Sequence, residues 1–360
     1  MGNAVYTLQK VEGPIYRTIQ PLYLNPSSHL KVKACILTDF TLPSFVKVGE
    51  LYAQTFEKLG WDVEHRGLDA GRDRLMGGYD IVFQNMNGRN FIPVEGCKNI
   101  AFFVHEWSHY PPAWIPYLDK FDALWTTTLH CKEIAERSGL KPPAYWIPPA
   151  MDIEPFPQKA EYSANAPFRF LYVGEWHFRK GLHLLFEAWQ CAFPQIGEAH
   201  LTVKTSQNCP FESPRKDIKI IKEKWPRERL LQLYVNCDCY VSTSLGEGWG
   251  LPIIEAIQCG LPVCANLWGG HQSMLDECSC FPIQHEETPQ PYASQPEFYA
   301  PGQACGFSDI GHIVDALQQA IHSDFRYRAK IAQSARHKIE QAYALASVIE
   351  KNERFKSLSN

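Results

Sequence analysis

Two glutamates lie eight positions apart in the segment Gly246-Glu-Gly-Trp-Gly-Leu-Pro-Ile-Ile-Glu255. A strand-like run, Cys239–Ser244, precedes this segment, and Pro252 suits the first turn of a helix, where the missing N–H of proline is not needed. Glycines just before a helix N-terminus let backbone N–H groups approach an anion, whose charge the helix dipole favours. The spacing therefore predicts a phosphate site, although an ordinary tight turn between a strand and a helix explains the glycines as well.

The carboxylates of Glu247 and Glu255 make a ligand the better explanation. Carboxylate oxygens accept paired hydrogen bonds from neighbouring hydroxyl groups, so one glutamate can hold a sugar and the other a ribose, on either side of a diphosphate. The segment has neither the Lys-Ser/Thr pair of a Walker A loop nor the spacing of the dinucleotide-binding glycine motif. The acids and the glycines together favour a nucleotide diphosphate sugar.

A pair of cations follows another strand-like run, Phe168–Val173. Arg179 and Lys180 occupy the loop between this run and an amphipathic helical pattern. Two adjacent cations in such a loop can bind a diphosphate and offset charge on a departing nucleotide, whereas the alternative is a solvated pair at the start of a helix. Lys204 ends the strand-like run His200–Lys204 and is a further candidate for facing the nucleotide.

The residues His105-Glu-Trp-Ser-His109 satisfy the HExxH pattern of zinc metalloproteases. That chemistry needs both imidazoles on one face of a sustained helix. Here a strand-like run leads directly into the motif, and Pro111-Pro112 follows it. We therefore expect no zinc site and no other metal site at this position.

The run Ser244–Val263 resembles the donor signature of retaining glycosyltransferases with a GT-B fold, especially glycosyltransferase family 4, the glycosyl transferases group 1. The likeness extends over about residues 32–345. It implies that Glu247 contacts the donor sugar and Glu255 the ribose of the nucleotide. It also implies that a short stretch of the chain binds the donor: Gly248, Trp249, Gly250 and Leu251.

The resemblance also assigns roles outside this run. Family members commonly place a histidine near the reacting centre at the strand end occupied by His105, so His105 and Glu247 are the candidate catalytic residues. Lys180 matches the lysine of the family, but the usual arginine position holds Glu175. We expect Arg179 to substitute for that arginine, and Glu175 to point away from the diphosphate or be neutralised. The loop Asp39–Phe45 lacks the glycine pair found in many relatives.

Short apolar strands alternate with helical patterns from about Leu30 onward, which predicts an α/β protein with parallel sheets. We expect a Rossmann-like domain over residues 1–150, a linker over 151–164 and a second, donor-binding Rossmann-like domain over 165–344, with a ligand cleft at the carboxyl ends of both sheets. Residues 283–307 predict an ordered loop. The resemblance implies that a last helix, about residues 345–360, crosses back to the first domain.

Composition limits the function classes. The chain has 360 residues, a formal net charge of −4 and 45% hydrophobic residues, so nothing global indicates nucleic-acid binding. We expect no signal peptide and no membrane span, and hence a cytoplasmic protein. The twelve cysteines include no CxxC motif and predict buried reduced thiols. A basic run after Ser323 is typical of a solvated face, with contact to an anionic membrane as the alternative: Arg326, Arg328, Lys330, Arg336 and Lys338.

These features together predict a retaining, metal-independent transfer of a sugar from a UDP- or GDP-sugar to a hydroxyl of a glycan or lipid-linked acceptor, with no cofactor beyond the nucleotide sugar. Retention of configuration is implied by the resemblance. Two alternatives stay open. One is a nucleotide-sugar 2-epimerase of the same architecture, and the other is a non-catalytic subunit that binds a nucleotide sugar.

Overall fold

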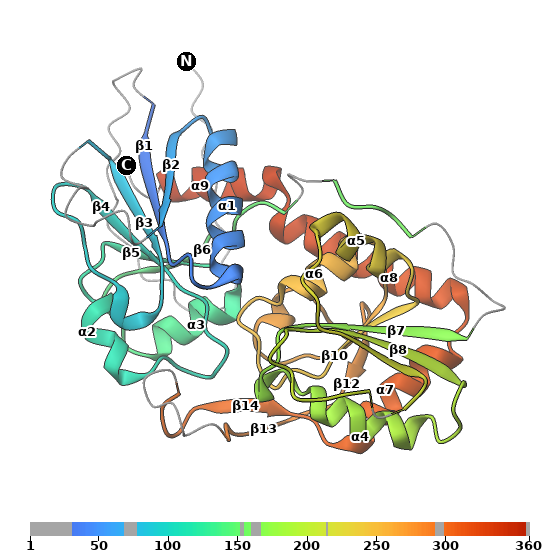
Figure 1. Cartoon of the computed structure of the whole chain (residues 1–360). Coiled ribbons are helices and arrows are strands. Elements are labelled where there is room, and N and C mark those ends of the chain that lie inside the picture. Colours follow the sequence, from blue (N-terminus) through green and yellow to red (C-terminus); the bar gives the residue numbers. More distant parts are fainter. Residues whose placement is uncertain are drawn as a thin grey trace, which may run out of the picture.

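A computed structural model describes residues 31–67, 78–151, 155–159, 167–213, 215–291 and 299–357. Within these ranges the chain forms two six-stranded sheets, both wholly parallel, each in a domain of its own (Figure 1). The predicted α/β class with two Rossmann-like domains is confirmed. Residues 1–30 lie outside the described part of the chain, as do residues 152–154 and 160–164 of the linker expected at 151–164.

The first sheet has the strand order β2-β1-β3-β4-β5-β6, so the order reverses between β1 and β3. Helix α1 (Pro43–Lys58) follows β1, and α3 (Leu129–Arg137) follows β5. Strand β2 at the edge of the sheet has a charged, half-exposed sequence without the apolar run that marks its neighbours. The strands are β1 (Lys33–Thr38), β2 (Asp62–Gly67), β3 (Ile81–Asn85), β4 (Lys98–Phe102), β5 (Ala123–Thr126) and β6 (Ala144–Trp146), with a short helix α2 (Ile115–Leu118) between β4 and β5.

The second sheet has the order β12-β11-β10-β7-β8-β9 and reverses between β7 and β10. Its strands are β7 (Phe168–Val173), β8 (Ala199–Lys204), β9 (Ile218–Ile221), β10 (Cys239–Ser242), β11 (Val263–Asn266) and β12 (Phe281–Ile283). The helices of this half are α4 (Leu182–Ala192), α5 (Arg227–Val235), α6 (Leu251–Gln258), α7 (Ile310–His322) and α8 (Phe325–Tyr343). Ligands of doubly wound sheets bind where the strand order reverses, beyond the carboxyl ends of the strands.

Residues 283–307 are not the plain loop expected from the sequence. Strands β13 (Glu286–Pro289) and β14 (Ala304–Phe307) pair antiparallel in a two-stranded ribbon, and residues 292–298 between them are outside the described part. Each strand has only four residues, so neither produces a recognisable alternation of apolar and polar side chains.

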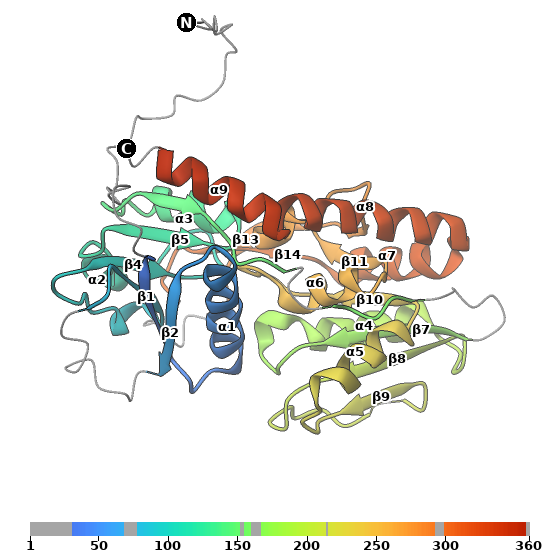
Figure 2. The same ribbon diagram turned by 90° about the horizontal axis from the view of Figure 1, so that it is seen from above.

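The last helix, α9 (Leu345–Ser357), crosses back to the first domain, as the resemblance implied. Figure 2 shows α9 continuing the path of α8 and lying over the first domain. Val348 is fully buried, and the Lys351 ammonium lies 3.8 Å from the centroid of the Trp146 ring at the end of β6. The Met151 amide also donates to the Tyr343 carbonyl at 2.8 Å, which ties the end of the first domain to α8.

The basic run on α8 is not a uniform solvated face. Arg328 is buried with its guanidinium 5.0 Å from the centroid of the Phe168 ring. Arg336 pairs with Glu340 at 3.0 Å, and Lys338 pairs with Asp276 at 2.7 Å. The intramolecular partners of these residues reduce the charge that α8 presents to a surface. No helix in the described ranges is long and apolar enough to span a membrane.

All twelve cysteines fall within the described ranges and are free thiols, and nine of them are buried, as their apolar surroundings predicted.

Candidate functional site

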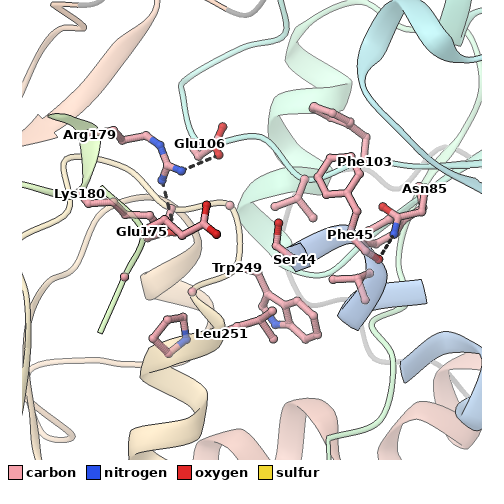
Figure 3. Close-up of a pocket in the computed structure, with 18 residues that line it drawn as sticks. Ser44, Phe45, Asn85, Phe103, Glu106, Glu175, Arg179, Lys180, Trp249 and Leu251 are labelled. Atoms are coloured by element: carbon pink, nitrogen blue, oxygen red, sulfur yellow. Dashed lines mark hydrogen bonds and ion pairs between the residues drawn. The ribbon is translucent and has the colours of Figure 1, made fainter. Parts of the chain in front are cut away.

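A cavity of about 310 Å³ lies where the carboxyl ends of the two sheets face each other. Its wall is built by the segments that follow β1, β3 and β4 in the first domain and β7 and β10 in the second, so both points of strand-order reversal contribute. Seven of the predicted residues line it together, several of them drawn in Figure 3: Arg179, Lys180, Glu247, Gly248, Trp249, Gly250 and Leu251.

Glu247 is held between two cations. The Lys180 ammonium lies 2.5 Å from Glu247 Oε1, and Arg179 Nη1 lies 3.4 Å from Oε2. Burial by itself would raise the pKa of Glu247, but Lys180 and Arg179 outweigh it and lower this pKa to about 2. The carboxylate is therefore ionised near neutral pH, and it faces a cavity in which it can accept hydrogen bonds from sugar hydroxyls.

Arg179 connects the two domains. Its Nη2 lies 3.0 Å from Oε1 of Glu106 in the first domain (Figure 3). Its Nη1 donates to the Gly246 carbonyl at 2.6 Å. Glu106 was not singled out from the sequence, although it stands inside the HExxH match beside His105. A diphosphate at this cavity would compete with Glu106 and Glu247 for the two cations.

The glycines of the motif are needed for different physical reasons. Gly250 precedes α6 with φ 90°, in the left-handed region that favours glycine. A Cβ on Gly248 would lie 2.1 Å from Val104 Cγ1, and one on Gly246 would lie 2.5 Å from the Glu106 carbonyl oxygen. Gly246 and Gly248 therefore allow the first domain to approach the loop closely. The sequence alone had suggested that these glycines allow an anion to approach.

The first turn of α6 is fixed by the side chain of Trp249. The indole is 3% exposed, and its ring centroid lies 5.9 Å from that of Tyr343 on α8. Trp249, Gly250 and Leu251 all line the cavity at this end of the helix. The N-terminus of α6, the positive end of the helix dipole, thus borders the same space as Arg179 and Lys180.

A second cavity of about 430 Å³ adjoins the first, and Gly174, Glu175, Leu251 and Pro252 belong to the walls of both. Glu255 lines this second cavity. Its carboxylate is oriented by Arg227 Nη1 at 2.7 Å and by the Tyr234 hydroxyl at 3.0 Å. The two glutamates of the motif consequently serve neighbouring cavities.

Lys204 lines the second cavity as well, at the end of β8. Its ammonium donates to the Thr205 carbonyl at 3.2 Å, and burial lowers its pKa from the ordinary value. The predicted placement of Lys204 on the nucleotide side of the site is compatible with this position.

Residues 156–279 match the family model described as glycosyl transferases group 1. This part of the chain is similar to the glycosyl transferases group 1. None of the curated proteins matches the sequence.

Solved structures resemble the chain over most of its length. Sucrose-phosphate synthase from Thermosynechococcus elongatus is 15% identical, with 91% of this chain and 99% of that one covered at a TM-score of 0.67. HepE of Anabaena, in complex with UDP and glucose, is 14% identical with the same coverages and a TM-score of 0.65. A glycosyltransferase from Rickettsia africae is 15% identical, with 91% and 98% covered and a TM-score of 0.62. The likeness establishes the predicted GT-B fold.

His105 lies in the first domain, behind the wall of the cavity. Its side chain is 1% exposed, and burial lowers its pKa to about 3, so the imidazole is neutral near neutral pH. Its Nε2 lies 2.9 Å from the amide nitrogen of Gln303, which also donates to the His109 carbonyl at 2.6 Å. The adjoining Glu106, and not His105, lines the cavity in this structure. Direct contact of His105 with a donor sugar stays a prediction.

Glu175, expected to point away from the diphosphate or to be neutralised, lines the site. Its exposed side chain lines both cavities, beside Arg179 and Lys180 in the first and Lys204 in the second. The reason is local: Gly174 follows β7 at the shared wall, and the Trp176 amide donates to Ser206 Oγ at 2.8 Å, which holds the loop there. The second domain therefore carries an exposed acid on the wall that both cavities share.

The HExxH match lies in an irregular segment and not on a helix, in agreement with the interpretation of its sequence context. Across the described ranges, no group of three or more His, Cys, Asp or Glu residues could hold a metal ion.

Proposed function

We propose that this chain transfers a sugar from a nucleotide diphosphate sugar to a hydroxyl acceptor, with retention of the anomeric configuration. The observation that carries the proposal is the pair of adjoining cavities, with Glu247 charged in one and Glu255 oriented in the other, on either side of the N-terminus of α6. The match of residues 156–279 to glycosyl transferases group 1 supports it.

In the proposed complex the diphosphate lies at the N-terminus of α6, where the positive end of the helix dipole favours anionic charge. Arg179 and Lys180 turn toward it from their present acidic partners and offset the charge that develops on the leaving nucleoside diphosphate. Glu247 accepts hydrogen bonds from the sugar, and Glu255 from the ribose. The base extends toward Lys204.

Two cations and a helix N-terminus can compensate a diphosphate, so we propose that transfer needs no metal ion. Retention rests on the resemblance of the donor segment to retaining enzymes. HepE was solved with UDP and glucose, which makes UDP-sugars the first donors to test and GDP-sugars the next.

Glu255→Ala tests the proposal. Loss of a charged hydrogen-bond acceptor at the ribose should weaken binding of the preferred donor about 10-fold to 100-fold. Isothermal titration calorimetry with UDP- and GDP-sugars measures the affinity, and mass spectrometry of products measures turnover. Glu228→Ala is the matched control, because this glutamate is exposed on α5 and lines neither cavity. Unchanged donor affinity and turnover in Glu255→Ala would refute the proposal.

A further inference from the structure

The 310 Å³ cavity has two unlike sides. Figure 3 shows Arg179, Lys180 and Glu106 on one side and Phe45 and Phe103 on the other. The charged side contains the proposed donor contacts. The opposite side belongs to the first domain and is where an acceptor has to enter, because the donor occupies the loop before α6.

The wall on the acceptor side is apolar. It consists of side chains from the start of α1 and from the end of β4, and Trp249 adds an indole from the second domain. The first-domain members are Phe45, Val48, Phe102, Phe103 and Val104. These apolar side chains gain free energy when apolar surface covers them, and they offer no hydrogen-bond partner to a hydroxyl.

The polar groups on this wall are few and largely engaged. Asn85 Nδ2 donates to the Phe45 carbonyl at 2.7 Å. Ser44 contributes a hydroxyl at the first turn of α1. An acceptor with many hydroxyls would lose hydrogen bonds to water here without replacing them.

Charge argues against an anionic acceptor at the same position. Among the residues described as lining this cavity, the cations are Arg179 and Lys180, both assigned to the donor, and the first domain contributes the acid Glu106. Lys47 of the first domain lines the adjoining ribose-side cavity instead.

We infer that the acceptor is an apolar alcohol, with one hydroxyl on an aromatic or aliphatic body that packs against Phe45, Val48 and Phe103. This inference rests on the proposed function. The acceptor oxygen forms a bond to the anomeric carbon while the bond from that carbon to the diphosphate oxygen breaks. The bonding electrons leave with the nucleoside diphosphate, whose oxygen takes the proton of the hydroxyl.

An acceptor panel tests the inference with the donor identified by calorimetry. It contains benzyl alcohol and hexanol as soluble apolar alcohols, dioleoylglycerol in phosphatidylcholine vesicles as a membrane lipid, and maltose as a sugar. Transfer to the soluble alcohols or to the lipid, with a higher kcat/KM than for maltose, supports the inference and identifies the source of the alcohol. Preference for maltose, or donor hydrolysis without transfer to any apolar alcohol, overturns it.

Phe45→Ala tests the wall directly. Removal of the ring should lower kcat/KM for the apolar alcohol about 10-fold or more, mainly through KM, and leave donor affinity unchanged. Phe40→Ala is the matched control, since Phe40 is 50% exposed in the turn before α1 and lines neither cavity. Val48→Thr keeps the shape of a wall residue while adding a hydroxyl, and it should also raise KM.

Different results would refute the proposed function and the inferred acceptor. Absence of binding of any nucleotide sugar by the unmodified chain refutes the proposed function. Donor binding together with unaltered acceptor kinetics in both Phe45→Ala and Val48→Thr refutes only the apolar acceptor.

Discussion

At the scale of single residues, the site depends on how buried charges are paired. Glu247 is 8% exposed and remains ionised only because Lys180 and Arg179 lie next to it. Arg179 in turn shares its guanidinium between Glu247 and Glu106. Removing one member leaves a buried charge without compensation, which is more destabilising than removing the whole network.

Glu247→Gln should lower sugar transfer roughly 100-fold, because the neutral amide no longer supplies an ionic acceptor at the donor sugar. It should also change the pH dependence of stability. The pKa of Glu247 is lowered from 4.5 to about 2 on folding, so its stabilising contribution is complete above pH 4.5 and is lost as the pH falls toward 2. Urea unfolding of both proteins at several pH values measures this.

The unmodified chain should therefore lose stability relative to Glu247→Gln as the pH is lowered through this range, by roughly 3 kcal/mol in the limit. A difference in stability that is independent of pH below 4.5 would contradict the ion-pair assignment.

At the scale of elements, the β13–β14 ribbon of the second domain fastens the loop after β4 of the first. The Ala304 amide donates to Ser108 Oγ at 2.8 Å, and the Ser108 amide donates to the Ala304 carbonyl at 3.3 Å. Gln303, wholly buried, adds the contacts to His105 and to the His109 carbonyl. The ribbon consequently determines where Glu106 is held relative to Arg179.

Gln303→Leu should destabilise the folded chain by about 1–3 kcal/mol, because the His105 ring nitrogen and the His109 carbonyl lose their donor in a buried setting. Thermal unfolding measures this loss of stability. The control is Thr288→Ala on the same ribbon, which removes a hydroxyl that contacts Cys305. Gln303→Leu should change KM for the donor more than Thr288→Ala does. Equal kinetics in the two variants would show that the ribbon does not position the site.

At the scale of the whole molecule, the two domains meet closely around the motif loop. Thr128 Oγ1 of the first domain donates to the Gly248 carbonyl at 2.9 Å. Trp107, also of the first domain and fully buried, packs in a cluster with Leu245, Trp268 and Cys305 of the second. The cleft is narrow because the backbone of the first domain closely approaches the backbone of the second at Gly246 and Gly248.

Gly248→Ala should force the domains apart, since its Cβ would meet Val104 at 2.1 Å and the His105 carbonyl at 2.8 Å. We expect a larger radius of gyration in small-angle X-ray scattering, a loss of about 1–3 kcal/mol in stability and a stronger effect on transfer than on donor binding. Gly250→Ala is the comparison, because its nearest neighbours lie 3.5 Å away in the same domain and the cause of destabilisation is its φ of 90°. An unchanged radius of gyration in Gly248→Ala would contradict the close approach.

The sequence by itself determined the features that are written into contiguous residues. Apolar runs predicted most strands of both sheets, and the glycine and proline spacing before Glu255 predicted the turn into α6. The sequence predicted that Arg179, Lys180 and Glu247 lie close together, because each follows a strand of a parallel sheet. The carboxyl ends of such strands share one edge of the sheet.

The tertiary structure alone decided which surfaces meet across the cleft. It paired Arg179 with Glu106, buried His105 behind the wall, turned Glu175 toward both cavities and assigned Gly248 to the contact between domains. Each of these depends on side chains from different domains or from a ribbon without a local pattern. Local sequence records propensity and periodicity, whereas the packing of two domains is a property of surfaces that exist only after both have folded.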